Sequence, residues 1–117
     1  MNKLQIAING FGRIGRTFFR VAMKHPEFDI VAINDLGDPK NLAYLLEYDT
    51  VYGRSDYPVT VKQTGKKTLF VVEGKEVEVL REREPRNLPW RDFDIDVVVE
   101  ATGVFRKPSD ARAHIEA

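Results

Sequence analysis

The stretch that decides the fold is Asn9-Gly10-Phe11-Gly12-Arg13-Ile14-Gly15-Arg16, near the start of the 117-residue chain. It follows a short apolar run at 4–8 that predicts a buried strand, and it opens a helical pattern over 13–24. One face of this helix is expected to carry its apolar residues, namely Ile14, Phe18, Val21 and Ala22. Glycines spaced G-x-G-x-x-G at a strand-to-helix turn are typical of a site for the pyrophosphate of a dinucleotide.

Each glycine of this motif has its own physical task. Gly10 permits the tight turn out of the strand, Gly12 lets the backbone approach a phosphate, and Gly15 lets the helix pack closely on the strand. The first amides of the helix lack internal partners, so together with the helix dipole they favour an anion at this end. We therefore expect a pyrophosphate to bind at the turn.

An acidic residue stands where such a site needs one. Asp35 follows the apolar run 30–33 and lies twenty residues past Gly15. Its carboxylate can accept hydrogen bonds from both ribose hydroxyls of an adenosine, and it would repel the extra phosphate of NADP, which carries about −1.5 to −2 charges. Asp35 could instead simply end a strand, but the glycines upstream favour the ribose role.

The remaining pattern completes an α/β domain. A helix is expected after Asp38-Pro39, an antiparallel meander over 59–80, a core position for Trp90, and a third parallel strand at 97–99. The fold class is thus a Rossmann-type doubly wound parallel sheet with an inserted antiparallel meander, incomplete at the C-terminus, with helices on its faces. If strand 97–99 lies beside strand 4–8, their carboxyl ends form the crevice in which such sheets bind ligands.

Composition excludes several classes of function. The chain is 43% hydrophobic and 31% charged, and its 18 basic residues equal its 18 acidic ones, which gives no reason to expect nucleic acid or a membrane surface as a partner. It contains no cysteine, so these residues provide neither disulfides nor thiol chemistry. We expect one domain in the cytoplasm, with no catalytic and no metal-binding residues.

The octapeptide at 9–16 resembles the N-terminal signature of the glyceraldehyde-3-phosphate dehydrogenase family. The resemblance extends along the whole chain, in order, through the segments 33–35, 48–54, 82–85, 88–90 and 102–105. It implies that residues 1–117 are the N-terminal part of an NAD-binding domain. The departures are peripheral: Tyr52, Glu84 and Ala101 stand where the family commonly has His, Asp, and Ser or Cys.

The resemblance also implies individual roles in NAD binding. Arg13 and Ile14 would meet the pyrophosphate and the nicotinamide region, Asp35 the adenosine ribose, and Arg83 the adenine through its backbone. Thr102 and Gly103 would line the cofactor, and Phe105 would wall the nicotinamide side. The complete set of expected cofactor-binding residues is Gly10, Phe11, Gly12, Arg13, Ile14, Gly15, Asn34, Asp35, Arg83, Ala101, Thr102, Gly103 and Phe105.

The family's chain is considerably longer and carries a catalytic domain after the cofactor domain. Its reaction uses a cysteine thiolate against the aldehyde, a histidine base, hydride transfer to NAD and phosphate attack on the thioester. Because this chain has no cysteine, we expect it to bind NAD without catalysing the reaction, as a fragment of the enzyme. The parent would act on a sugar phosphate and inorganic phosphate and assemble as a homotetramer.

Two alternatives remain open from the sequence. The parent could be the related enzyme that oxidises erythrose 4-phosphate, which only residues of the catalytic half would decide. The chain could also be a non-catalytic nucleotide-binding or oligomer-forming module. A titration with NAD and NADP tests this second alternative, because failure to bind either nucleotide would leave only a structural role.

Overall fold

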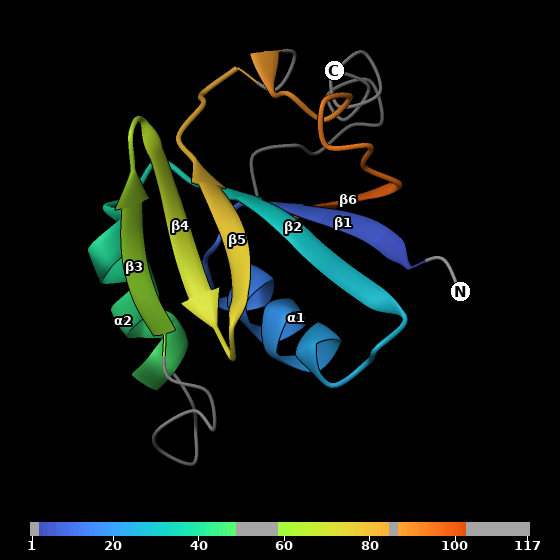
Figure 1. Cartoon of the computed structure of the whole chain (residues 1–117), viewed down its shortest axis with the longest axis horizontal. Helices are drawn as coiled ribbons and strands as arrows, with labels where there is room; N and C mark the ends of the chain where they lie inside the picture. Colours follow the sequence, from blue (N-terminus) through green and yellow to red (C-terminus); the bar gives the residue numbers. More distant parts are fainter. Residues whose placement is uncertain (1–2, 49–58, 85–86, 103–117) are drawn as a thin grey trace.

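The computed structural model describes residues 3–48, 59–84 and 87–102 (Figure 1). These residues form one six-stranded sheet in the order β3-β4-β5-β2-β1-β6, together with two helices. In chain order the elements are β1 (Leu4–Asn9), α1 (Arg13–Met23), β2 (Phe28–Asn34), α2 (Pro39–Tyr48), β3 (Val59–Thr64), β4 (Lys67–Val72), β5 (Lys75–Leu80) and β6 (Val97–Glu100). The predicted Rossmann-type α/β sheet with an inserted antiparallel meander is confirmed.

The sheet has a parallel part and an antiparallel part. Strands β5, β2, β1 and β6 run parallel, with β6 beside β1 as expected. Strands β3, β4 and β5 form the antiparallel meander predicted from the alternating pattern. The two parts share β5, so the meander continues the parallel sheet. The order reverses between β1 and β6, and their carboxyl ends open the crevice where such sheets bind ligands.

The pairing of β1 with β2 contains one irregularity. Ile6 pairs with Ile30, but Ala7 pairs with Ala32, so Val31 has no partner on β1. An extra residue of this kind is a β-bulge, which is uncommon between parallel strands. Beyond the bulge the ladder continues to its last rung, where the strand-end residues Asn9 and Asn34 face each other.

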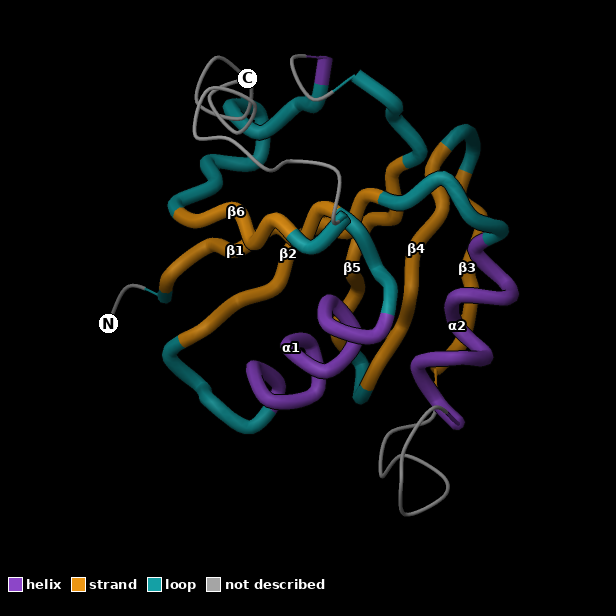
Figure 2. The backbone as a smooth tube through the Cα atoms, turned by 180° about the vertical axis from the view of Figure 1, so that it is seen from behind, coloured by secondary structure: helices purple, strands orange, loops and turns teal. Residues whose placement is uncertain are grey.

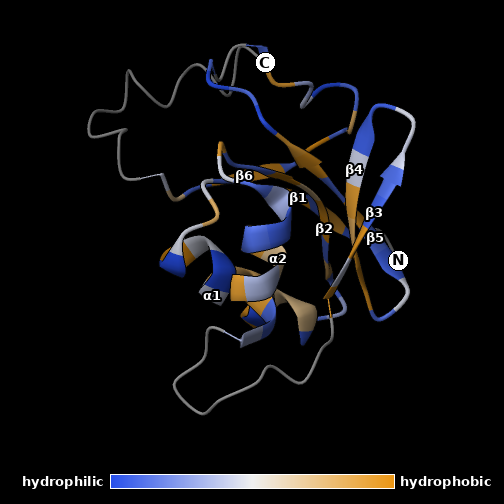
Figure 3. Cartoon of the chain, turned by 90° about the vertical axis from the view of Figure 1, so that its left-hand side faces the viewer, coloured by the Kyte–Doolittle hydropathy of each residue, from blue (hydrophilic) through white to orange (hydrophobic). Residues whose placement is uncertain are grey.

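Both helices cover the same face of the sheet. Figures 2 and 3 show α1 and α2 on one side of the sheet, and the hydropathy colours of Figure 3 show apolar residues concentrated along the strands. The core on this side includes Phe11, Phe19, Leu46 and Phe70. The crossovers from β1 to β2 and from β2 to β5 step in the same direction across the sheet. Because both are right-handed, their connections lie on the same face. Within the described ranges the helices therefore cover one face, and not both as had been expected.

The opposite face is covered by the connection that precedes β6. Trp90 and Leu88 are 3% exposed there and pack with the small residues Ala7 and Ala32. This connection returns to the far side of β1, so a right-handed crossover must pass over the face that the helices leave open. Trp90 is therefore a core residue, as the sequence predicted.

The predicted apolar face of α1 is right for Phe18, which packs against the core, and for Ala22, and it is wrong for Ile14 and Val21. Ile14 and Val21 are 72% and 52% exposed, whereas Gly15, Phe19 and Ala22 are buried. The helix bounds agree with the expectation, since α1 ends at Met23 with Lys24 as its C-cap. The helix is rotated because Gly15, which has no side chain, packs against the Gly10 carbonyl and the Ile8 side chain at the end of β1. The neighbours of Gly15 at helical spacing then face the core.

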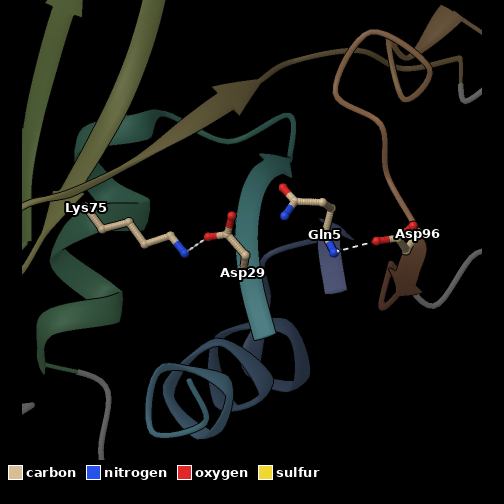
Figure 4. Close-up of polar contacts among 4 residues, drawn as sticks. All are labelled: Gln5, Asp29, Lys75 and Asp96. Atoms are coloured by element: carbon tan, nitrogen blue, oxygen red, sulfur yellow. Dashed lines mark hydrogen bonds and ion pairs between the residues drawn. The ribbon is translucent and has the colours of Figure 1, made fainter. Parts of the chain in front are cut away.

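Polar links join the strands at their amino ends, away from the crevice. Lys75 of β5 forms an ion pair with Asp29 of β2, and the backbone N–H of Gln5 donates to Asp96, just before β6 (Figure 4). Burial and the nearby Lys3 lower the pKa of Lys75 below its ordinary value of 10.5. Within the described ranges, neither helix is long and apolar enough to cross a membrane.

Candidate functional site

The glycine turn joins the carboxyl end of β1 to α1 and packs directly against the end of β6. Gly10 has a φ of +96°, and a Cβ atom there would lie 2.6 Å from the backbone nitrogen of Thr102. The Gly10 N–H donates to the carbonyl of Asn34 at 2.8 Å. Both the left-handed conformation and the lack of space require glycine at this position.

The other two glycines have opposite surroundings. A Cβ atom on Gly15 would lie 2.2 Å from the carbonyl oxygen of Gly10, so this glycine is needed for packing. A Cβ atom on Gly12 would meet no heavy atom within 4 Å. The space beside Gly12 is therefore open to a ligand, as the close approach of a phosphate requires.

The amino end of α1 faces this open space without a side-chain cap. Gly12 is the N-cap residue, and no side chain caps the first turn with a hydrogen bond. No acidic residue lies in that turn. Helix amides left without partners favour an anion, and an acidic side chain would have competed for that place.

Asp35 connects the second strand to the turn. The backbone N–H of Phe11 donates to Asp35 Oδ2 at 2.7 Å, and that of Gly37 donates to Asp35 Oδ1 at 2.8 Å. A carboxylate has about four acceptor positions, so these two bonds leave capacity for the hydroxyls of a ribose. The acid thus lies within one hydrogen bond of the turn that its spacing from the glycines predicted.

A cavity of about 530 Å³ lies over the carboxyl ends of the parallel strands. Of the residues expected to bind the cofactor, the cavity brings together Gly10, Gly12, Asn34, Asp35, Arg83, Ala101 and Thr102. Sequence reasoning missed three further lining residues, Asn9, Leu36 and Glu82. Segments from four strand ends therefore converge on one site.

The other expected site residues lie beside the cavity or outside the described ranges. Phe11 is fully buried and packs edge-on against Phe19, with ring centroids 5.8 Å apart, so only its backbone is near the cavity. Arg13 and Ile14 are exposed on the first turn of α1, and Gly15 is buried beneath it. Gly103 and Phe105 lie outside the residues that the structure describes.

Buried polar side chains form the base of the cavity. Asn9 and Asn34, each 4% exposed, bond to one another at 2.8 Å, and Asn9 also donates to Glu100. Asn34 further bonds to both the N–H and the carbonyl of Glu82. Asn9, Asn34 and Glu100 each end a strand, which is the only sequence signal that pointed to them. Fold and crevice together define an α/β dinucleotide-binding domain of the Rossmann type.

Comparison with known families identifies the particular domain. A family model described as "Glyceraldehyde 3-phosphate dehydrogenase, NAD binding domain" matches residues 4–108. The chain therefore belongs to this family, and NAD is the cofactor of the domain. The resemblance in the octapeptide is thereby confirmed.

Curated relatives agree with this family. The chain is 51% identical over 111 residues to "Glyceraldehyde-3-phosphate dehydrogenase 1" of Bacillus cereus, which covers 95% of the chain and 32% of the relative. It is 50% identical to the glyceraldehyde-3-phosphate dehydrogenase of Geobacillus stearothermophilus and 48% identical to that of Salmonella typhimurium. Those matches cover 97% of the chain and 33% of each relative. The chain thus spans about a third of the length of these relatives.

Proposed function

We propose that the crevice binds NAD with its pyrophosphate over the glycine turn and its adenosine ribose on Asp35. The observation that supports this pose best is the hydrogen bond from the Phe11 N–H to Asp35 Oδ2, next to the open space at Gly12. The bond holds the ribose acceptor beside the phosphate-binding amides. The glycine turn thus binds the pyrophosphate of the adenosine diphosphate group, and the adjoining Asp35 binds its ribose.

The ends of the cofactor follow from this placement. The adenine lies beside Arg83, which lines the same cavity as Asp35. The nicotinamide half extends past Ala101 and Thr102. The expected contacts Gly103 and Phe105 lie outside the described residues. Ile14 is exposed on the first turn of α1, where an apolar side chain offers the nicotinamide ring a surface.

We further propose that residues 1–117 are the cofactor-binding part of a phosphorylating glyceraldehyde-3-phosphate dehydrogenase in the cytoplasm. The names and the near 50% identity of the curated relatives support this parentage. Such an enzyme takes a sugar phosphate and inorganic phosphate and assembles as a homotetramer. Bound NAD supplies the hydride acceptor. These residues bind and orient the cofactor, while the thiolate comes from outside them because they include no cysteine.

A nucleotide titration tests the binding proposal. Trp90 is the only tryptophan of the chain and is buried, so its fluorescence reports the folded state during the experiment. Isothermal titration calorimetry is expected to show NAD binding and weaker NADP binding, because the Asp35 carboxylate repels a 2′-phosphate. A folded chain that binds neither nucleotide would overturn the proposal.

A further inference from the structure

The side chain of Asn34 uses both of its donors and its carbonyl oxygen in protein contacts. Its Nδ2 donates to the carbonyl of Glu82 at 2.9 Å and to Asn9 Oδ1 at 2.8 Å. Its Oδ1 accepts the Glu82 N–H at 2.8 Å. Both amide hydrogens are therefore used within the protein, so this side chain has no donor left for a cofactor.

These bonds extend the sheet by one rung. Backbone pairing between β2 and β5 ends at Asn34 and Leu80. The Asn34 amide then bonds to both main-chain polar groups of Glu82, two residues further on. Arg83, which lines the adenine end of the cavity, follows directly. The buried Asn34 side chain therefore helps to hold this wall, together with the Arg81 side chain, which donates to the Leu36 carbonyl at 2.9 Å.

The chain of bonds continues in the other direction across β1 to β6. Asn9 accepts from Asn34 and donates its own Nδ2 to Glu100 Oε2 at 2.9 Å. Glu100 Oε1 accepts the N–H of Thr102 at 3.1 Å and its hydroxyl at 2.6 Å. The bonds thus run from the adenine wall to Thr102, which lines the opposite part of the cavity.

The direction of every bond in this series is fixed by its ends. The Glu82 N–H can only donate and its carbonyl can only accept, which sets the orientation of the Asn34 amide. That orientation presents a donor to Asn9, whose own donor must then face Glu100. A carboxylate offers acceptors only, so it suits the donors that it receives from both sides. If one of these groups were reversed, a buried donor would face another donor or a buried acceptor would face another acceptor.

We propose that Asn34, Asn9 and Glu100 are positioning residues for NAD, acting as one directional relay of hydrogen bonds. The relay keeps Arg83, the carboxyl ends of β2 and β1, and Thr102 in fixed positions relative to one another. The proposal rests on the proposed NAD-binding function, and it gives Asn34 an indirect role in place of contact with the cofactor.

A double-mutant cycle between positions 34 and 100 tests the relay. Asn34→Asp turns the relay's donor into an acceptor, so Asn9 must invert its amide and then presents its oxygen to Glu100. Glu100→Gln alone places an amide nitrogen against a donor. In the double variant the inverted Asn9 donates to the new carboxylate at position 34 and accepts from the new amide at position 100, and the net charge is that of the wild type. The Glu82 carbonyl faces a carboxylate oxygen in the single Asn34→Asp variant and in the double variant alike, so the rescue is partial.

We expect each single variant to weaken NAD binding about tenfold or more, because each leaves buried polar groups facing their like. The double variant is expected to bind at least about fivefold more tightly than the product of the two losses allows, since positions 34 and 100 both bond to Asn9 and can couple through it. If the loss of NAD affinity in the double variant equals the product of the two single losses, the relay is overturned. Calorimetry measures the affinities, and circular dichroism verifies that each variant is folded.

Asp29→Asn is the matched control. It breaks the ion pair to Lys75, which joins the same two strands as the Asn34–Glu82 bonds but at their other end (Figure 4). The control is expected to lower the unfolding midpoint and leave NAD affinity unchanged. An equal loss of affinity in the control would show general loosening of the sheet and would overturn positioning.

The remaining outcomes separate the two proposals. A folded wild-type chain that does not bind NAD would overturn the proposed function and the positioning role together. A wild type that binds, with multiplying losses in the variants, would overturn the relay alone. Should Asn34→Asp fail to fold, Glu100→Gln compared with Asp29→Asn carries the test, and an unchanged affinity in Glu100→Gln would refute the relay.

Discussion

Gly15→Ala and Gly12→Ala each add one methyl group near the glycine turn. We expect the first to lower stability and the second to lower NAD affinity. At Gly15 the new Cβ lies 2.2 Å from the Gly10 carbonyl oxygen, about 0.8 Å inside the 3.0 Å limit that real contacts respect. That oxygen belongs to the peptide whose N–H bonds to Asp35, so it cannot move without disturbing this bond. At Gly12 the Cβ enters open space.

The expected magnitudes follow from these surroundings. Alanine in a helix gains about 1 kcal/mol over glycine, but overpacking against a fixed group costs about 1–3 kcal/mol or more. Because the obstacle at Gly15 is backbone, we expect a net loss of about 2 kcal/mol, or on the order of 10 °C in melting temperature. Gly12 has a φ of −78°, which any residue adopts, so its replacement should change stability by less than about 1 kcal/mol.

The assay combines urea unfolding, followed by Trp90 fluorescence, with calorimetric titration of NAD. Gly12→Ala is expected to keep its unfolding midpoint and to lose at least about tenfold in NAD affinity, because the methyl occupies the space proposed for the phosphate. Gly15→Ala is expected to lose stability. A Gly15→Ala chain as stable as the wild type, or a Gly12→Ala chain that binds NAD normally, would refute this account of the turn.

Three further predictions concern other parts of the domain. Asp35→Asn should weaken NAD binding about tenfold and reduce the preference for NAD over NADP, because the amide loses the charge and places hydrogens toward either the Phe11 N–H or the Gly37 N–H. Parallel titrations measure both affinities, and an unchanged ratio of NAD to NADP affinity contradicts the prediction. Trp90→Ala should cost about 3–5 kcal/mol, measured by circular dichroism melting, and a loss below about 1 kcal/mol would show that the residue is not a core anchor. Burial and Lys3 lower the pKa of Lys75, so the unfolded state binds more protons than the folded state just below pH 10.5. The free energy of unfolding of the wild type should therefore rise relative to that of Lys75→Met as the pH approaches 10.5 from below. Urea unfolding measures both values, and a difference that stays flat or falls would contradict the prediction.

Local spacing was sufficient to predict most of the crevice. The apolar runs before Gly10 and before Asp35 defined two strands, and parallel strands with short connections bring their carboxyl ends to one edge. The structure places Asp35 one hydrogen bond from the turn, and it places β6 beside β1. These results depend on residues that are close in sequence or on general rules of handedness.

The orientation of α1 could not be obtained from hydrophobicity alone. Apolar side chains lie around much of the helix, so several faces offered a plausible stripe. The deciding residue is Gly15, which a hydrophobicity pattern does not count, yet its contact with the Gly10 carbonyl turns Phe19 inward and Ile14 outward.

The polar base of the cavity was missed for a different reason. Asn9, Glu82 and Glu100 are far apart in sequence, and their partners depend on the lateral order and register of the strands. A polar residue at a strand end reads as the start of a loop until its neighbours across the sheet are known. Only the folded register shows that these side chains satisfy one another.

Because Val31 has no pairing partner on β1, the number of residues between the glycine motif and Asp35 can vary by one. The loss of Val31 would leave a regular ladder in which Asn9 still faces Asn34, because Ala32 would simply succeed Ile30 opposite β1. A homologous chain one residue shorter at this point would build the same crevice. Searches that demand a fixed count between glycine motif and carboxylate would reject such a chain, although nothing in its three-dimensional site had changed.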